Sequence, residues 1–341
     1  MPDDSGMQKR FWFSSILPAL TLMVMAPLIA EVLPGATRMS SIFVFPIEVL
    51  IWGGGAVMAR YLVRKYRLGW ANLLLLALAL SIAEEVLIQQ TSVAPMVIKL
   101  KGVEYARAFD VNYVYLLWAL LYEAIFVVLI PVGLTELIFP SRKNDGWLNR
   151  WGIGVIVGLF LPACFMAWYS WTQVARTTIF HLPDYQLPLT YAAAGAAAIA
   201  VLLLLAVGPT RRMLAAQAKP LTPPHPVVVF GLAVAAAAVI FGLCLLGFGI
   251  QPAFPPAAAV AIALVLALIL FLFAPRFMAH DGWGRWHDIA AQYGMILSNF
   301  AVMFVAFIGA APVDLYGKVV LDAVAVLLML WLMVARMPRK A

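Results

Sequence analysis

The sequence predicts an all-α, polytopic integral membrane protein, a helical bundle of about ten transmembrane helices. Two observations carry this prediction. Hydrophobic residues make up 65% of the 341 residues and charged residues 11%, against about 45–50% and about 25% in an ordinary soluble protein. Apolar runs of about 20 residues, long enough to cross the hydrocarbon core of a bilayer as helices, recur along the whole chain.

The apolar runs divide into ten expected spans. The first follows a short polar tail and has no small-residue cleavage site, so we interpret it as a retained helix rather than a signal peptide. The run at 257–273 is short, and together with its neighbour across residues 251–256 it is also compatible with a hairpin. The expected spans are 11–33, 43–63, 70–90, 113–138, 151–171, 189–208, 227–249, 257–273, 289–310 and 319–335.

Basic residues predict the orientation of the bundle. With the N-terminus in the cytoplasm, 17 of the 23 Lys and Arg residues fall on cytoplasmic segments and six on outer segments. The positive-inside rule therefore predicts an N-in, C-in arrangement, in a bacterial cytoplasmic (inner) membrane. The formal charge of +7 comes from these helix ends, so we expect the lipid bilayer, and no nucleic acid, as a partner.

Intramembrane acids divide the chain into two expected halves. Residues 1–188 form an N-terminal membrane half that holds nearly all of these acids, and residues 189–341 form an apolar C-terminal half. A stiff, Pro-rich cytoplasmic linker is expected at 219–226. The polar residues of the two halves do not match, unlike those of an inverted-repeat transporter. The outer loops at 91–112 and 172–188 either cover a site that opens outward or are ordinary connectors.

Two adjacent glutamates, Glu84 and Glu85, lie inside the apolar run 70–90. A carboxylate in a bilayer core costs about 2.5–3.5 kcal/mol on insertion scales, so such residues mark a site, a pathway or a structural pair. With α-helical spacing Glu85 shares a polar stripe with Gln89, whereas Glu84 lies about 100° around the helix from that stripe. The other members of the stripe are Ser81 and Ser92.

Three further glutamates, on the neighbouring spans, come at a similar depth in the outer half of the membrane. Glu123 lies well inside the fourth span, Glu48 lies early in the second, and Glu31 ends the first. Glu31 and Glu48 are also compatible with a simple position at the outer interface. Our leading hypothesis is an outward-facing acidic pocket that binds a substrate or an ion, formed by Glu48, Glu84, Glu85, Glu123 and Gln89.

Other polar groups are candidates for the same cavity or for structural hydrogen bonds. Asn299 in the ninth span either lines the cavity or bonds a neighbouring helix, and the same alternative holds for Asp322 in the last span. The buried glutamates are also compatible with structural hydrogen bonds to Tyr122, Gln89 or Ser81. The outer-side cations that are candidate ion-pair partners are Lys99, Lys101, Arg107 and Arg176.

Close carboxyl groups allow several kinds of chemistry. They can share a proton, act in turn as general base and general acid, relay protons or hold a hard cation. No metal site is predicted, because no H-E-x-x-H motif is present and the four histidines avoid the middle of the spans. Cys164 and Cys244 both lie in apolar runs, so neither a disulfide framework nor a cysteine-type metal site is expected. The sequence predicts no particular cofactor.

The stretch Glu84-Glu85-Val86-Leu87-Ile88-Gln89 resembles the first motif of the CAAX-processing and bacteriocin-protection intramembrane protease family. That motif reads E-E-x-x-x-R, and here Gln89 takes the place of the arginine. The counterpart of the family's F-x-x-x-H motif is Tyr122–Phe126, which has no histidine, and no later span carries His-x-x-x-Asn. The resemblance covers about twenty residues of the 341. It implies that Glu84 and Glu85 are catalytic, water-activating acids, and the missing histidines imply a degenerate relative.

Three functional hypotheses follow from the sequence. The first is a transporter-like or sensor protein whose acidic pocket binds a cation, a proton or an amphiphilic small molecule; it predicts that Asn299 contacts the glutamates. The second is an intramembrane hydrolase, which predicts a histidine or metal beside Glu84 or Glu85, with His181 as the one candidate. The third is a non-catalytic subunit of a membrane complex, which predicts internally paired acids and an apolar face for a membrane-protein partner.

Overall fold

The computed structural model describes residues 4–95, 105–212 and 219–335, with the side chains of residues 4–15, 210, 212, 305 and 306 left out. The described chain is almost entirely helical, and its one sheet has two short strands. The α-helices are α1 Asp4–Pro27, α2 Phe45–Glu48, α3 Gly54–Lys65, α4 Trp70–Ile82, α5 Tyr113–Glu123, α6 Ile130–Ile138, α7 Arg150–Trp168, α8 Leu189–Val207, α9 Pro226–Gly247, α10 Pro256–Met278, α11 Arg285–Met303 and α12 Pro312–Ala335.

Shorter helical segments extend or join these α-helices. In five of them the backbone hydrogen bonds follow the wider π pattern: η1 Leu28–Val32, η3 Val49–Gly53, η4 Ala83–Ile88, η5 Ala124–Leu129 and η7 Tyr169–Ile179. Four others are 3₁₀ turns: η2 Met39–Val44, η6 Pro140–Arg142, η8 Pro209–Arg212 and η9 Phe304–Phe307.

The prediction of an all-α, multi-pass helical bundle is confirmed. Eight helices in the described ranges are long and apolar enough to cross a membrane, and a ninth apolar helix, Ile16–Val32, is shorter. The stretch expected as the ninth span, 289–310, is helix α11, which is not among the eight because polar side chains interrupt it. The short run at 257–273 extends to a full helix of 23 residues, α10. The eight helices are Met39–Lys65, Trp70–Ile88, Tyr113–Ile138, Arg150–Ile179, Leu189–Val207, Pro226–Gly247, Pro256–Met278 and Pro312–Ala335.

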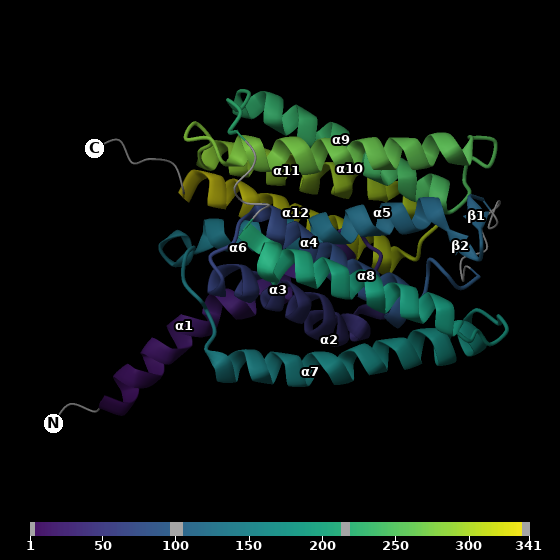
Figure 1. Ribbon diagram of the computed structural model, residues 1–341, viewed down its shortest axis with the longest axis horizontal. Helices are drawn as coiled ribbons and strands as arrows, with labels where there is room; N and C mark the ends of the chain where they lie inside the picture. The colour runs from purple at the N-terminus through teal and green to yellow at the C-terminus, as the bar shows by residue number, and fades with distance from the viewer. Residues whose placement is uncertain (1–3, 96–104, 213–218, 336–341) are drawn as a thin grey trace.

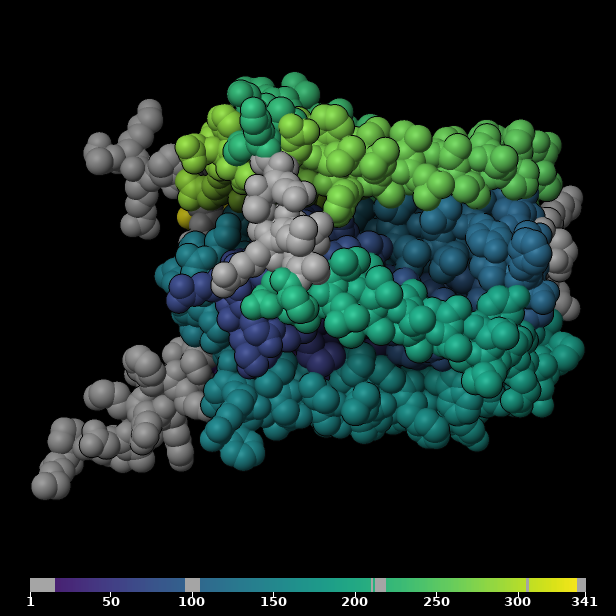
Figure 2. Space-filling view, viewed as in Figure 1, coloured from purple at the N-terminus to yellow at the C-terminus, as the bar shows by residue number. Residues whose placement is uncertain are grey.

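The long helices lie side by side along one axis (Figure 1). The described beginning of α1 and the described end of α12 lie at one end of the bundle, and the strands β1 and β2 lie at the other. The two expected halves share one bundle, since α4 packs against α8 and α5 packs against α9. Figure 2 shows that α7 and α8 form a broad outer surface, with a hollow between α8 and α10 above α4 and α5.

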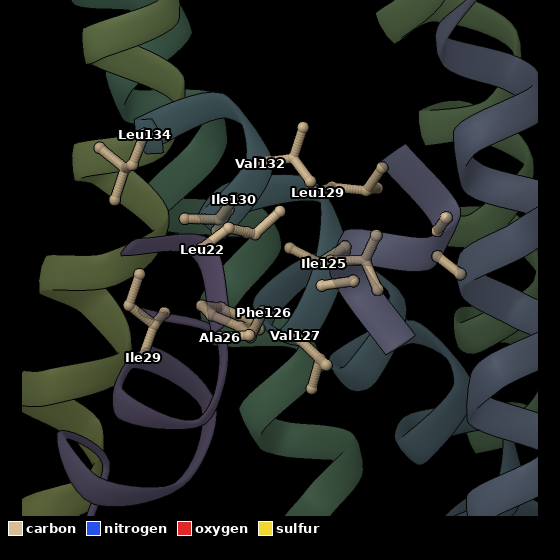
Figure 3. Packing of buried hydrophobic residues seen from close by; sticks show 14 of the residues in the cluster. Leu22, Ala26, Ile29, Ile125, Phe126, Val127, Leu129, Ile130, Val132 and Leu134 are labelled. Carbon is tan, nitrogen blue, oxygen red and sulfur yellow. The ribbon is translucent and has the colours of Figure 1, made fainter. Parts of the chain in front are cut away.

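The main cluster of buried apolar residues joins the first helix to the fourth expected span. Leu22 and Ala26 of α1 have no exposed surface, and they face Phe126 of η5, which is 1% exposed (Figure 3). Lipid tails are as apolar as these side chains, so helices in a membrane associate through close packing of their side chains. This core therefore fixes the position of η5 against η1, and both segments flank the intramembrane acids.

A short hairpin, which we did not predict, lies in the outer loop after η4. Strand β1 (Arg107–Ala108) pairs antiparallel with β2 (Val111–Asn112). Both turn residues, Phe109 and Asp110, have positive φ values of 47° and 56°. A two-residue turn with this backbone suits the right-handed twist of paired strands.

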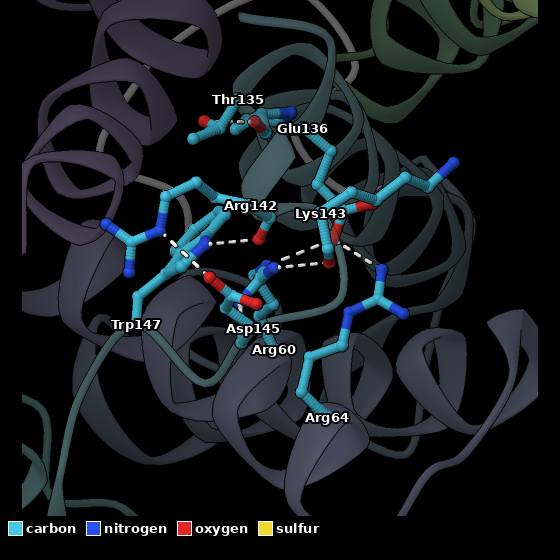
Figure 4. A network of polar contacts seen from close by, with 9 residues as sticks. Arg60, Arg64, Thr135, Glu136, Arg142, Lys143, Asp145 and Trp147 are labelled. Atoms are coloured by element: carbon cyan, nitrogen blue, oxygen red, sulfur yellow. Dashed lines mark hydrogen bonds and ion pairs between the residues drawn. The ribbon is translucent and has the colours of Figure 1, made fainter. Parts of the chain in front are cut away.

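A buried ion-pair network closes the expected cytoplasmic end (Figure 4). Arg60 donates from Nε to Glu136 Oε1 over 3.0 Å and from its terminal nitrogens to the carbonyl oxygens of Lys143 and Asp145. Its guanidinium carbon lies 3.1 Å from the centre of the Trp147 ring. Arg60 is 2% exposed, so this one side chain joins α3, α6 and the following loop.

We expect Arg60→Ala to lower the free energy of unfolding by about 3–5 kcal/mol, because it removes one partner of a buried ion pair. Arg142→Ala is the control, since Arg142 pairs with Asp145 at a partly exposed position and such pairs contribute about 0–1 kcal/mol. Denaturant unfolding of the detergent-purified variants measures both changes. Equal losses in the two variants would contradict the structural role of Arg60.

The last span begins earlier than predicted. Helix α12 starts at Pro312 rather than 319, so Lys318, expected in an outer segment, lies inside the helix and is 2% exposed. Its Nζ donates to Asp322 and to the carbonyl oxygen of Leu33, each over 2.7 Å. The i, i+4 pair and the carbonyl oxygen satisfy the ammonium group, and thereby allow a lysine in an otherwise apolar helix. Asp322 thus pairs within its own helix.

Candidate functional site

Each of the four helices that carry the intramembrane glutamates has a π-helical segment beside its glutamate. Glu31 lies in η1, Glu48 directly precedes η3, Glu84 and Glu85 lie in η4, and Glu123 directly precedes η5. The hydrogen bond from Gln89 N to Glu84 O, 2.7 Å long, shows the i→i−5 pattern. π-Helical turns are rare and occur frequently at functional sites. Their recurrence at one level of four helices marks this level as specialised.

Glu84 is 3% exposed and accepts hydrogen bonds from two neutral side chains. Trp52 Nε1 donates to one carboxyl oxygen, and Gln89 Nε2 donates to the other over 3.1 Å. The α-helical analysis placed Gln89 on the stripe of Glu85, which is wrong. The π turn brings residues five apart onto one side, so Gln89 bonds Glu84 instead.

Glu85 and Glu123 complete a group of three carboxyls. Ser92 Oγ donates to Glu85 Oε2 over 2.6 Å, and the Glu123 side chain lies beside those of Glu84 and Glu85. Glu123 is 7% exposed, and its Oε2 has no hydrogen-bond partner. A carboxyl group donates to another carboxyl only when it carries a proton. We call Glu84, Glu85 and Glu123 the carboxyl triad.

Two more glutamates surround the carboxyl triad. Glu48 is buried, accepts a hydrogen bond from Thr37 Oγ1, and keeps a second oxygen without a partner. Glu31 lies within electrostatic range of Glu48, Glu84 and Glu85. The structure thus places Glu31 and Glu48 near the carboxyl triad. Simple exposure at the outer interface does not describe Glu48.

Trp52 and Thr37 are site residues that the sequence analysis missed. The signal for Trp52 was present, because an indole N–H in an apolar helix needs an acceptor, and the nearby acids are the available acceptors. Thr37 lies in a short connection between the first two helices, where nothing in the sequence distinguishes it from an ordinary loop residue.

Asn299 does not contact the glutamates directly. Its Nδ2 lies 3.3 Å from the Tyr122 hydroxyl, which itself donates to the carbonyl oxygen of Ala30 over 2.6 Å. Because Tyr122 directly precedes Glu123 in the chain, α11 contacts the sequence neighbour of a site residue and not the site residue itself. Of the three side chains expected as structural partners of the acids, Gln89 bonds Glu84. Tyr122 and Ser81 instead donate to the carbonyl oxygens of Ala30 and Ala77.

The candidate outer cations bind backbone rather than the acids. Arg107 donates to the carbonyl oxygens of Val93, Ala94 and Asp110. Arg176 donates to those of Pro183 and Pro95. Both side chains order the outer loops. Lys99 and Lys101 lie outside the described residues.

A small pocket lies beside the carboxyl triad, next to loops that are expected to face outward. It has a volume of about 10 Å³, enough for about one water molecule. Gln89 lines it and at the same time bonds Glu84, so the glutamine side chain lies between the pocket and the triad. The expected loop 172–188 contributes here, although its first part, to Ile179, is helical. The remaining lining residues are Gln90, Thr91, Ala94, Pro95, Trp171, Thr172, Arg176 and Tyr185.

The Tyr185 hydroxyl in this pocket stays neutral. Burial raises its pKa above the ordinary value, while the nearby Arg107 acts in the opposite direction. The Arg176 guanidinium lies 5.7 Å from the centre of the Tyr185 ring. The pocket therefore presents one cation and neutral polar groups to the outside, and the acids lie behind them.

Histidines take no part in the hydrogen bonds described for Glu84 and Glu85, whose donors are Trp52, Gln89 and Ser92. His181 is exposed, in the loop expected to face outward. Within the described ranges no group of three or more His, Cys, Asp or Glu side chains has a geometry that holds a metal ion. The hydrolase hypothesis therefore gains no partner for its two catalytic candidates.

Comparisons with known proteins assign no family or function to the chain. No protein-family model matches the chain, and neither a curated protein nor a solved structure is detectably similar to it. The resemblance of the glutamate pair to intramembrane proteases accordingly remains a prediction from about twenty residues of the sequence.

Proposed function

We propose that this multi-pass membrane protein binds and releases protons at the carboxyl triad, as a transporter-like protein or sensor in a bacterial cytoplasmic membrane. The observation that carries the proposal is the grouping of three buried carboxyl groups, from two helices, within interaction range of one another. Glu84, Glu85 and Glu123 act as one coupled site in which at least one proton is shared. The ligand exchanged for that proton is a cation or an amphiphilic cationic molecule.

The surroundings of the triad favour protons over a permanently bound metal ion. The donors to Glu84 are an indole and an amide, so its hydrogen-bond partners bring no positive charge that would hold the carboxyl ionised. Glu123 Oε2 is buried without a partner, which leaves one acceptor ready for an incoming cation. The Gln89 side chain lies between the carboxyl triad and the outer pocket.

The first test is an infrared pH titration of the detergent-purified protein. We expect a protonated-carboxyl band at neutral pH that disappears as the pH rises, because loss of the shared proton converts the triad to carboxylates. Glu123→Gln removes a large part of this band while conserving side-chain volume. Asp184→Asn, at an exposed outer position, leaves it unchanged. A wild-type protein without such a band at neutral pH would refute the proposal.

The exchange step has a separate test with tetraphenylphosphonium as the probe. Binding of this lipophilic cation to the purified protein in weak buffer is expected to release about one proton per cation, since opposite charge favours the ionised carboxyls. The Glu84→Gln/Glu85→Gln variant is expected to bind the probe at least about tenfold more weakly, because the variant loses a charge-assisted contact with the cation. Binding without proton release would separate cation binding from proton exchange and contradict the coupling.

A non-catalytic subunit is the second candidate, and one observation favours it. The acids are paired inside the bundle, while α7 and α8 expose large apolar side chains, among them Trp151, Phe165 and Leu189. These faces suit a lipid bilayer as well as a partner helix. A folded, stable Glu84→Gln/Glu85→Gln variant that behaves as wild type in both tests above would support this candidate.

A further inference from the structure

A large apolar groove is separate from the carboxyl triad, although Ala124, beside Glu123, contributes to its wall. Its volume is about 740 Å³, and its walls come mainly from α4, α5, η5, α9, α10 and α11. It opens on the face seen in Figure 2, between α10 and the helices α4 and α5. None of the triad residues lines it, so it is a second site, separate from the one described above.

The groove occupies the predicted cytoplasmic half of the bundle. On α4, which begins at the predicted cytoplasmic end, its lining residues are Trp70, Leu74 and Leu78. On α10, which ends there, the lining runs from Leu264 to Met278. The groove therefore lies at the depth of the inner leaflet and opens sideways toward lipid.

One end of the groove is polar, and this end lies at the cytoplasmic surface. Asp288 is the one charged residue in the lining, and its Oδ1 accepts a hydrogen bond from Trp283 Nε1 over 2.7 Å. Gln292 lines the groove one helical turn further on, and its buried Oε1 has no hydrogen-bond partner. Lys143 lies within electrostatic range of Asp288. Two acceptors thus lie at the mouth of an otherwise apolar groove, and Lys143, which does not line it, lies near Asp288.

We propose that this groove binds a chain of an inner-leaflet aminophospholipid, with the primary ammonium of the headgroup at Asp288 and Gln292 and the phosphate near Lys143. The apolar walls replace the lipid environment of the chain. A primary ammonium supplies the N–H donors that the carboxylate and the free amide oxygen accept. A choline headgroup has no N–H, and an anionic headgroup brings a net negative charge toward Asp288.

Other occupants fit these features less well. A transmembrane helix of a partner or a second copy of the chain could use the alanines of the lining for close contact. The apolar side chains of such a helix, however, would leave Asp288 and the free Gln292 oxygen without a donor. The polar end therefore distinguishes a lipid from a helix.

Native mass spectrometry of the full-length, detergent-purified protein tests the chain site. We expect adducts with palmitoyl-oleoyl phosphatidylethanolamine that weaken about tenfold in Ala267→Phe, because the added ring fills the groove. Ala261→Phe is the matched control, an exposed position on the same helix that does not line the groove. Ala235→Phe and its control Ala238→Phe repeat the comparison on α9, should Ala267→Phe fail to fold.

Headgroup selection has its own variant. Wild type is expected to bind phosphatidylethanolamine about tenfold more tightly than phosphatidylcholine or phosphatidylglycerol with the same chains, a preference lost in Asp288→Asn. Asp281→Asn, on the exposed loop before α11, keeps it. Binding that ignores the headgroup, or that Ala267→Phe leaves intact, would overturn the proposal. A change of oligomeric state in Ala267→Phe without loss of lipid would assign the groove to a second copy of the chain.

Discussion

Gly53→Ala is expected to prevent the first two helices from packing and to remove most folded protein. A Cβ atom at Gly53 would lie 2.1 Å from the Met23 carbonyl oxygen and 2.6 Å from Met23 Cα. These are backbone atoms of α1, which cannot move aside as a side chain does. Overpacking of a core costs about 1–3 kcal/mol and occasionally more, and here whole helices must separate. Thermal unfolding and size-exclusion chromatography in detergent measure the loss.

Gly54→Ala provides the matched control one residue away. A Cβ atom there meets only Ile156 and Phe160 side-chain atoms at 3.6 Å, an ordinary contact distance. We expect a change of less than about 0.5 kcal/mol, as for most substitutions that make no new clash. Similar behaviour of the two alanine variants would mean that the close approach of α1 and η3 is not essential to the fold.

Gln89→Ala is expected to expose the carboxyl triad to reagents from the outer side. A water-soluble carbodiimide reacts with protonated carboxyl groups, so labelling is expected to fall as the pH rises. Wild-type labelling at Glu84 is expected to be slow, because the Gln89 side chain lies between Glu84 and the pocket. Removal of the Gln89 side chain opens the barrier and is expected to speed labelling by about tenfold, the effect of one lost hydrogen bond on access. Peptide mass spectrometry locates and times the modification.

Gln90→Ala is the control for this effect. Gln90 lines the same outer pocket, but its amide donates to the carbonyl oxygen of Leu87 rather than to an acid. The labelling rate of this variant is therefore expected to match that of wild type. Equal acceleration in Gln89→Ala and Gln90→Ala would show that the pocket as a whole, and not Gln89, controls access.

Hydrophobicity was enough to predict the architecture. Long apolar runs predict helices because a backbone in lipid must satisfy its own hydrogen bonds, and the boundaries of α8 and α9 lie close to those expected. The start of α12 was misplaced because Lys318 was counted as a loop residue. A pattern of single residues does not show that Asp322 and a distant carbonyl oxygen satisfy that lysine inside the membrane.

The candidate site could be predicted in its members but not in its contacts. The cost of intramembrane acids is enough to single out Glu84, Glu85 and Glu123. Their partners depend on the π-helical turns, and a 3.6-residue period assigns Gln89 to the wrong glutamate. Trp52 and Thr37 join through tertiary packing of the first two helices, which no local pattern contains.

The π-helical turns beside the glutamates also allow these helices to change register in steps. A π turn is an α-helix with one inserted residue, and the insertion can move along the helix while every backbone N–H keeps an acceptor nearby. Each residue that the insertion passes is rotated by about 100°. On η4, one such step would rotate Glu84 or Glu85 by that angle about the helix axis. Four adjacent helices have such a π-helical segment beside a glutamate, at a similar depth. Each helix can therefore rotate its glutamate side chain while the helix stays folded.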